Sequence, residues 1–181
     1  MACVSVALLL ATLRVSGADP VLLRWDRRQQ IVGATIPVFS ADAARETALL
    51  RIGRVRGRYG KQGVLRVAWR REAYLEDVVL EVRDSSDWPR IAEAVVCAVR
   101  ELGRAGTARV RRFTLRQCDG ERTVVNAAEA ELLPDGDLLL QSVAIRRGDG
   151  PVTEANDYVL HLSAPESALA VLLAGAQPST P

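Results

Sequence analysis

The stretch that decides the fold runs from residue 77 to residue 102 and reads DVVLEVRDSSDWPRIAEAVVCAVREL. In its first part Val78, Leu80 and Val82 share one side of an extended chain. Such period-two alternation predicts a strand with one buried and one solvated face. The second part changes to helical spacing, so the sequence predicts a strand followed directly by a helix.

The helix is predicted near residues 87–103. Asp87 is a good N-cap, Pro89 is tolerated in the first helical turn, and Gly103 is typical of a helix end. The apolar residues of this segment fall on one stripe at helical spacing. They are Ile91, Ala94, Val95, Ala98 and Leu102. We therefore expect the helix to pack on a sheet through this stripe.

The chain downstream of the helix reads as a series of strands. They are predicted over residues 108–117, 122–133, 138–147 and 157–162. Pro134-Asp135-Gly136-Asp137 is a strong hairpin signal, and Gly148-Asp149-Gly150 ends the third of these strands. The spacing from Ser163 to Glu166 resembles a capping box and predicts a short C-terminal helix.

Upstream, strands are predicted over residues 21–25, 31–39 and 64–70. Residues 40–56 are ambiguous: either Ser40 caps a helix, or residues 47–55 form a strand. Several glycines between residues 53 and 63 are interpreted as a flexible loop.

Together these patterns predict an α+β fold, a predominantly antiparallel β-meander with one central helix packed on the sheet. The 181 residues suit a single domain. We place this β-rich domain at residues 19–162, after a candidate signal peptide or truncated anchor at residues 1–18. Residues 163–181 are expected to form the short helix and a loose tail.

The N-terminal interpretation depends on the apolar run VSVALLLATL at residues 4–13. It is shorter than the roughly 20 residues of a membrane-spanning helix and has the length of a signal-peptide core. Small residues precede a candidate cleavage site before Asp19. We therefore expect a periplasmic or secreted protein, with peripheral or anchored membrane association open. The alternative is a cytoplasmic domain in which this run is a buried strand or helix.

Charge is nearly balanced, with 24 basic and 22 acidic residues and a formal net charge of +2. This balance disfavours nucleic acid as the default partner but allows a local basic patch. Arginines gather around Trp25 and around Tyr59. The candidate residues for binding phosphate or a lipid headgroup are Arg24, Arg27, Arg28, Arg54, Arg56 and Arg58. The alternative is a solvated strand face.

The motifs of common active sites are missing from the sequence. His161 is the only histidine, no G-x-S-x-G surrounds a serine, and Gly60-Lys61 lacks the rest of a phosphate-binding loop. We therefore predict no catalytic, cofactor-binding or metal-binding residues. Cys97 and Cys118 would be a candidate disulfide in an oxidising compartment, although Cys97 is better explained as a small buried hydrophobe.

The phrase TVVNAAEAELLPDGDLLLQSVAIRRGDG at residues 123–150 resembles the strand-turn-strand units of the LptC/OstA-like lipopolysaccharide-export family. The resemblance covers residues 31–150 and is one of style, without a diagnostic motif. The helix at residues 87–104 departs from that family's sheet. The resemblance implies a non-enzymatic role, in which an apolar groove shields acyl chains and edge strands pair with neighbouring subunits.

The expected function is therefore that of a non-enzymatic cell-envelope or secreted protein. It would handle lipid or lipopolysaccharide, or dock a strand of an envelope protein. The alternative is a cytosolic interaction or nucleic-acid-binding module that uses the arginine clusters.

Overall fold

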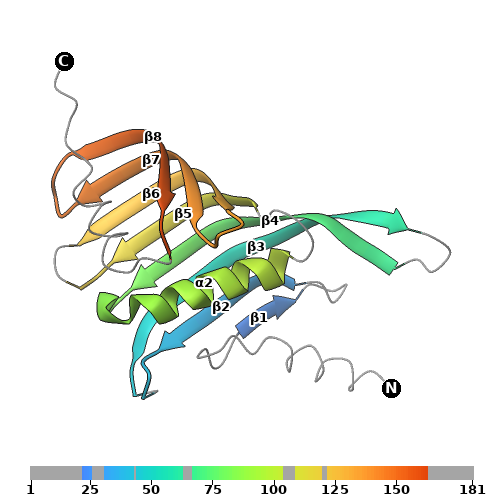
Figure 1. The fold of residues 1–181 in the computed structure, drawn as a ribbon, viewed down its shortest axis with the longest axis horizontal. Helices are drawn as coiled ribbons and strands as arrows, with labels where there is room; N and C mark the ends of the chain where they lie inside the picture. Colours follow the sequence, from blue (N-terminus) through green and yellow to red (C-terminus); the bar gives the residue numbers. More distant parts are fainter. Residues whose placement is uncertain are drawn as a thin grey trace.

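In the part of the chain that it describes, the computed structural model has one open eight-stranded sheet and a helix that lies against one of its faces (Figure 1). The residues that the structure describes are 22–25, 31–42, 44–62, 67–103, 109–119 and 122–162. The predicted leader at residues 1–18 and the predicted C-terminal helix lie outside them. The mostly antiparallel, β-rich architecture with one helix is confirmed for the described part of the chain.

The strands follow one another in the sheet in chain order. Their bounds are β1 Leu22–Trp25, β2 Ile31–Phe39, β3 Glu46–Gln62, β4 Val67–Val82, β5 Arg109–Gln117, β6 Thr123–Leu132, β7 Leu138–Arg147 and β8 Val152–Leu160. Every neighbouring pair is antiparallel except β4 and β5, which are parallel. Parallel neighbours need a long crossover connection, and the helix α2 (Trp88–Gly103) supplies it.

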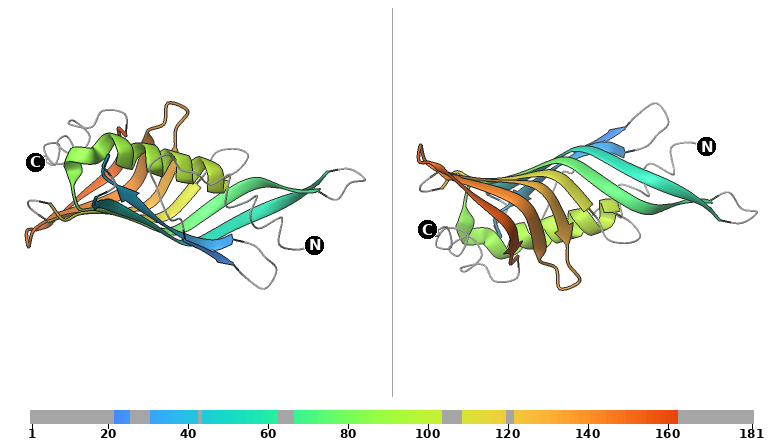
Figure 2. Two further views of the ribbon diagram at one scale, coloured as in Figure 1. Left: turned by 90° about the horizontal axis from the view of Figure 1, so that it is seen from below. Right: turned by 90° about the horizontal axis from the view of Figure 1, so that it is seen from above.

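The helix packs on the sheet through its predicted apolar stripe. Ile91, Ala94, Val95 and Ala98 are almost fully buried, and they belong to one apolar core with the inner faces of β2 to β8. The two views in Figure 2 show α2 on one side of a curved sheet. The sheet therefore has an inner face toward α2 and an outer face away from it.

The start of the helix differs in one detail from the prediction. A short 3-10 turn, η1 (Ser85–Asp87), precedes α2, and the side chain that caps this turn is Asp84. Asp84 Oδ1 accepts a hydrogen bond from the backbone N–H of Ser86 at 3.0 Å. The Asp87 carboxylate instead accepts a hydrogen bond from the Thr47 hydroxyl at 3.2 Å. Asp87 therefore links the helix start to β3 rather than acting as the predicted N-cap.

β3 and β4 are long strands that pair over most of their length, although the sequence predicts only shorter strands in this region. β3 has 17 residues and β4 has 16, and their pairing continues from Ala48↔Val82 to Gln62↔Val67. Of the two alternatives for residues 40–56, the strand over residues 47–55 is therefore confirmed and the helix capped by Ser40 is wrong. The glycine-rich loop is wrong for residues 53–62, which belong to β3. A ladder of cross-strand hydrogen bonds outweighs the weak strand propensity of glycine.

A line of irregular residues crosses six neighbouring strands at one register. The ladders pair Ile52 with Val78 and Arg54 with Glu76 but leave out the position between them, and each following pair of strands omits the matching position. The omitted residues, which we call the crease, are Gly53, Asp77, Arg112, Ala128, Ser142 and Asn156. Asp77, Arg112 and Ser142 have positive φ angles of 56°, 57° and 52°.

The crease changes which residues face the core. Along an ordinary strand buried residues recur every second position, but across the crease they are three apart. These pairs are Ile52 and Val55, Leu75 and Val78, Val110 and Phe113, Ala127 and Ala130, and Leu140 and Val143. In β3 to β7, apolar side chains on both sides of the crease thus turn toward the inner face.

The remaining predictions hold in outline. β2 and β7 have the predicted bounds, and the 134–137 turn joins β6 to β7 with Gly136 at a φ of 98°. β8 begins at Val152, five residues before the predicted start of this strand. Its first half has no buried face, so it lacks the apolar alternation by which strands are recognised.

Candidate functional site

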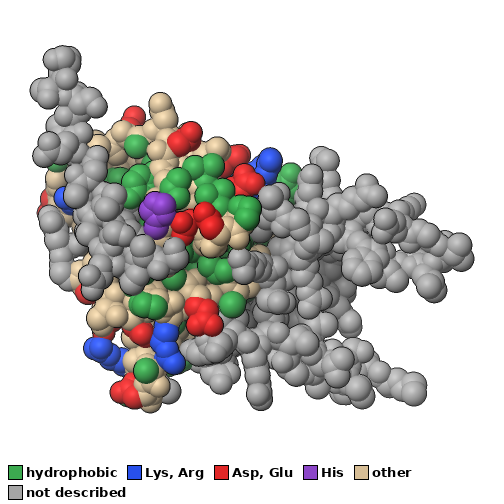
Figure 3. All heavy atoms as spheres, in the orientation of Figure 1, with side chains coloured by type: hydrophobic (Ala, Val, Ile, Leu, Met, Phe, Trp, Pro, Cys, Tyr) green, Lys and Arg blue, Asp and Glu red, His purple; other side chains and the backbone are tan. Residues whose placement is uncertain are grey.

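The second arginine cluster lies on the outer face of the sheet. Arg54 and Arg56 are exposed on β3, and so is their neighbour Arg51. Figure 3, which looks onto the α2 side, accordingly shows few basic side chains over the middle of the sheet. Arg58 also belongs to β3, opposite Glu72, but its side chain lies outside the described part.

The first arginine cluster is largely outside the described residues. Arg24 belongs to β1, where its backbone pairs with Gly33, and its side chain is not described. Arg27 and Arg28 lie outside the described residues altogether. Of the six candidate arginines, only Arg54 and Arg56 therefore have described side chains.

The carboxylates of β4 pair with arginines from both neighbouring strands. Glu81 lies between Arg51 of β3 at 3.5 Å and Arg116 of β5 at 3.6 Å. Arg56 Nε lies 3.1 Å from Glu76. Of the candidate arginines on β3, Arg56 is therefore ion-paired, whereas Arg54 has no ion pair with a described residue. Exposed ion pairs of this kind are also typical of a solvated strand face.

The outer face also carries the arginines of β5, which are not among the candidate residues predicted from the sequence. Arg109, Arg111, Arg112 and Arg116 are all exposed, and the Arg111 guanidinium lies 5.0 Å from the centre of the Tyr74 ring. Arg112 forms a two-pronged ion pair with Asp77, with distances of 2.6 and 2.9 Å. This hydrogen bonding lowers the pKa of Asp77 and raises that of Arg112. The sequence signal for this basic surface is the recurrence of arginines between apolar residues in the strand at residues 109–117.

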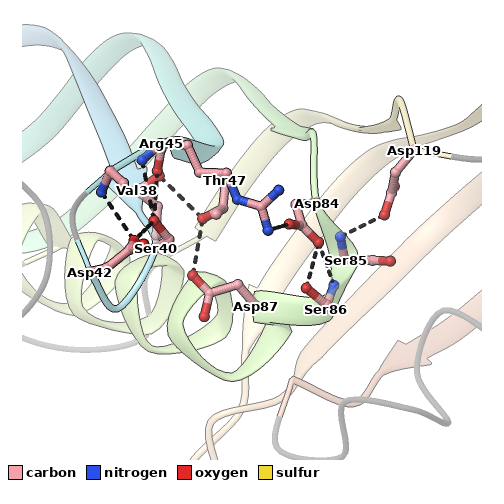
Figure 4. Close-up of polar contacts among 11 residues, drawn as sticks. Val38, Ser40, Asp42, Arg45, Thr47, Asp84, Ser85, Ser86, Asp87 and Asp119 are labelled. Atoms are coloured by element: carbon pink, nitrogen blue, oxygen red, sulfur yellow. Dashed lines mark hydrogen bonds and ion pairs between the residues drawn. The ribbon is translucent and has the colours of Figure 1, made fainter.

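Polar residues from distant segments meet at the end of the sheet where β3 begins (Figure 4). Asp84 forms an ion pair with Arg45, and Asp119 Oδ2 accepts a hydrogen bond from the Ser85 backbone N–H at 2.6 Å. Hydrogen bonding to Ser86 lowers the pKa of Asp84. Partial burial raises the pKa of Asp119, but hydrogen bonds from Ser85 and Gln117 outweigh it and the net shift is downward. This network ties loops together, and each of these aspartates serves the fold.

His161 follows β8, and its side chain is half-exposed. Its Nδ1 lies 2.7 Å from Asp137 Oδ2, and the other Asp137 oxygen accepts the Leu162 backbone N–H at 2.9 Å. Asp137 is buried in the β6–β7 turn. From the sequence Asp137 is predicted only as a turn residue. Local patterns cannot show its contact with His161, because 24 positions separate the two residues. The pair anchors the end of β8 to this turn.

Two acidic residues two positions apart, Glu129 and Glu131, lie on β6. Glu129 is exposed and Glu131 is half-buried, so both reach solvent. The buried positions around them do not follow simple alternation. Ala127 and Ala130 are both buried, because the crease at Ala128 reverses the alternation between them.

The candidate disulfide is not formed. Cys97 and Cys118 are both thiols in this structure, and Cys118 is exposed. Cys97 is partly buried and packs against the apolar core. This agrees with its interpretation as a small hydrophobic residue on the helix.

The edge strand β8 is the most open part of the described sheet. Val152 and residues 154–157 are exposed, so side chains on both faces of the strand reach solvent. Val152, at 55% exposure, is the one large hydrophobic side chain that is exposed among those described. By contrast, the apolar side chains of β5 to β7 on the inner face are buried.

A hollow of about 430 Å³ lies where β7 and β8 cross the crease. It is lined by Ser142, Val143, Ala144, Glu154, Ala155 and Asn156. Residues 154–156 belong to the edge strand, so the hollow opens beside the edge of the sheet.

The described residues contain no group of three His, Cys, Asp or Glu side chains arranged to hold a metal ion. In the same part of the chain, no helix has the length and apolar character needed to cross a membrane. No protein-family model matches the sequence, and no curated protein matches it either.

Proposed function

We propose that this is a non-enzymatic periplasmic or secreted protein that docks a strand of a partner protein on the edge of β8. The observation that carries the proposal is the exposure of β8. It is the last strand of the sheet in the part of the chain that the structure describes, and the exposed residues between 152 and 157 leave both of its faces accessible. An edge strand offers backbone N–H and C=O groups that an extended peptide can pair with.

The exposed Val152 supports the same proposal. A large apolar side chain at an accessible edge gains by burial when a partner strand covers it, by roughly 1.5–3 kcal/mol for complete burial. The inner face of the described sheet gives less support to lipid handling. Its apolar side chains already pack against α2 and against each other, which leaves an acyl chain little apolar surface there.

The arginines of the outer face support the alternative, an interaction module for anionic partners. Seven exposed arginines of β3 and β5 flank three carboxylates on β4, so this part of the surface is net basic. Only some of the arginines are paired, and Arg54 forms no ion pair with a described residue. We rank this alternative second because the ion pairs weaken the local field.

Strand docking is tested by hydrogen exchange with a neutral, strand-forming peptide of alternating valine and threonine. We expect the peptide to slow exchange of backbone amides in β8, because they gain hydrogen-bond partners. The matched control is the same peptide with alternate backbone nitrogens methylated, which removes its donors along one edge. Equal exchange with and without the peptide, or protection confined to other strands, would contradict the proposal.

The compartment is tested separately. Expression with an export assay, followed by mass spectrometry of the protein, is expected to give a mature N-terminus at Asp19. An N-terminus that retains Met1 in a cytoplasmic fraction would favour the cytoplasmic alternative.

A further inference from the structure

We propose that the hollow beside β8 holds the cationic side chain, Lys or Arg, of the docked strand, so that this edge recognises basic extended peptides. The inference rests on the proposed strand docking and names the chemistry of the partner. It is carried by three observations: the position of the hollow, its lining, and the charge of the strand.

The hollow is placed where a side chain of an added strand would reach it. Glu154 of β8 lies opposite Ala144 of β7, and Ser142 and Asn156 lie at the crease positions of the two strands. A strand added beyond β8 would lie about 4.8 Å away, with alternate side chains on each face. A long side chain on the outer face of that strand can therefore cross Glu154 and enter the hollow.

The lining suits a cation. Ser142 and Asn156 offer neutral oxygen atoms and Glu154 offers a carboxylate, while none of the six lining residues is basic. Ala144 and Ala155 are small and leave room for a long side chain. A guanidinium or ammonium group carries several donors and no acceptor, so it can bond to all three polar side chains at once.

The charge of β8 differs from that of the inner strands. On β4 the carboxylates of Glu76, Asp77 and Glu81 are all ion-paired with arginine. On β8 neither Glu154 nor Asp157 forms an ion pair with any described residue. Among the described residues, the edge strand thus carries two carboxylates that have no ion-pair partner.

These charges also select against a second copy of the chain. Pairing β8 with another β8 would bring both copies of Glu154 and Asp157 to one seam, and like charges across strands are destabilising. Acidic residues on an edge strand commonly serve to prevent such self-association. A basic strand turns the same charges into attraction, which is why we assign it as the partner.

The experiment uses the full chain and three nine-residue strand-forming peptides that differ only at their central residue. The central residue is Arg, Gln or Glu, and the affinity is measured by fluorescence anisotropy at low and at physiological salt. We expect the Arg peptide to bind about fivefold more tightly than the Gln peptide, and the Glu peptide to bind most weakly. Hydrogen exchange shows whether each peptide protects β8.

Two variants locate the effect. Glu154→Gln removes the carboxylate of the hollow, whereas Asp157→Asn removes one charge from the same strand outside the hollow. We expect Glu154→Gln to abolish the preference for Arg over Gln and Asp157→Asn to retain most of it. Both residues are exposed, so unchanged melting curves confirm that neither variant alters the fold.

The outcomes separate the two proposals. If the Gln peptide protects β8 and the Arg peptide binds no better, strand docking stands and the cation site is wrong. Equal loss of preference in both variants would also overturn the cation site, because it would show a general charge attraction. If no peptide protects β8, strand docking is wrong and the inference falls with it.

Discussion

Asp77 and Arg112 occupy matching positions on the parallel strands β4 and β5, both with positive φ, and their side chains form a two-pronged ion pair. Positive φ is uncommon for residues other than glycine, and here two such residues lie side by side. Both belong to the crease, so the sheet bends where its backbone leaves the ordinary β conformation. The bend lets both halves of the sheet turn apolar side chains toward α2.

On β3 the crease position is Gly53, and the close approach of β3 to β4 there depends on the absence of a side chain. A Cβ placed on Gly53 would lie 2.7 Å from the Asp77 Cβ and 3.2 Å from the Glu76 carbonyl oxygen. We therefore expect Gly53→Ala to lower the free energy of unfolding by about 1–3 kcal/mol, the usual cost of overpacking. Urea unfolding measures it. In an Asp77→Gly background, which removes the opposing Cβ, the cost of Gly53→Ala should shrink. An equal cost in both backgrounds would contradict this close contact.

The core beneath α2 is tested by Val95, which is 1% exposed. Val95→Asp should destabilise the protein by several kcal/mol, because it places an unpaired charge in the core. Glu93→Lys, at an exposed position of the same helix, is the control and should change stability little. Urea unfolding of both variants measures their free energies of unfolding relative to the wild type. Similar midpoints for Val95→Asp and the wild type would mean that the helix does not pack on the sheet.

We expect the stability of the fold to fall in acid because of two aspartates at the end of the sheet where β3 begins. The pKa values of Asp84 and Asp119 are lowered below their ordinary value of 3.8 on folding. Their contribution to stability is therefore present above pH 3.8 and is lost as the pH falls through the lower, folded-state pKa values. Asp119→Asn keeps an oxygen that can accept from the Ser85 N–H but removes the negative charge; weakening this hydrogen bond should cost about 0.5–1 kcal/mol at neutral pH and flatten the acid dependence.

Urea unfolding at pH 7 and pH 3 measures both effects. Asp149→Asn removes the same charge from an exposed turn and is the matched control. If Asp119→Asn and Asp149→Asn have the same pH dependence as the wild type, Asp119 does not contribute through its hydrogen bonds.

Glu81 screens two arginines of the outer face, Arg51 and Arg116. We expect Glu81→Gln to raise the salt concentration at which the protein elutes from heparin, because the released arginines can contact the anionic polymer. Glu93→Gln makes the same change in net charge on α2, away from this surface, and should shift elution less. Equal shifts for both variants would show that net charge alone governs retention.

The two described cysteines should react differently with a thiol reagent. Cys118 is exposed, whereas Cys97 is partly buried against the core. Without denaturant we expect rapid modification of Cys118 and slow modification of Cys97, because access limits the reaction. Mass spectrometry after short labelling distinguishes the sites, and Cys118→Ser should remove the fast phase. If neither cysteine reacts until a reductant is added, a disulfide between Cys97 and Cys118 would be favoured instead.

The sequence by itself determined the elements with strong local periodicity. The helix at 88–103, the strand at 138–147 and the turn at Gly136 all follow from residue spacing and turn chemistry, which act within a few residues.

Only the tertiary structure decided the features that depend on pairing between distant segments. The glycines of β3 are held in a strand by their partners on β4, and β8 is a strand because β7 supplies its hydrogen bonds. The crease left a trace in the sequence, as apolar residues three apart with two others between them, but its alignment across six strands requires their register. The hollow beside Glu154 likewise exists only where two strands cross the crease together. Local propensities cannot encode these relationships, because backbone hydrogen bonds between strands join residues that the chain keeps far apart.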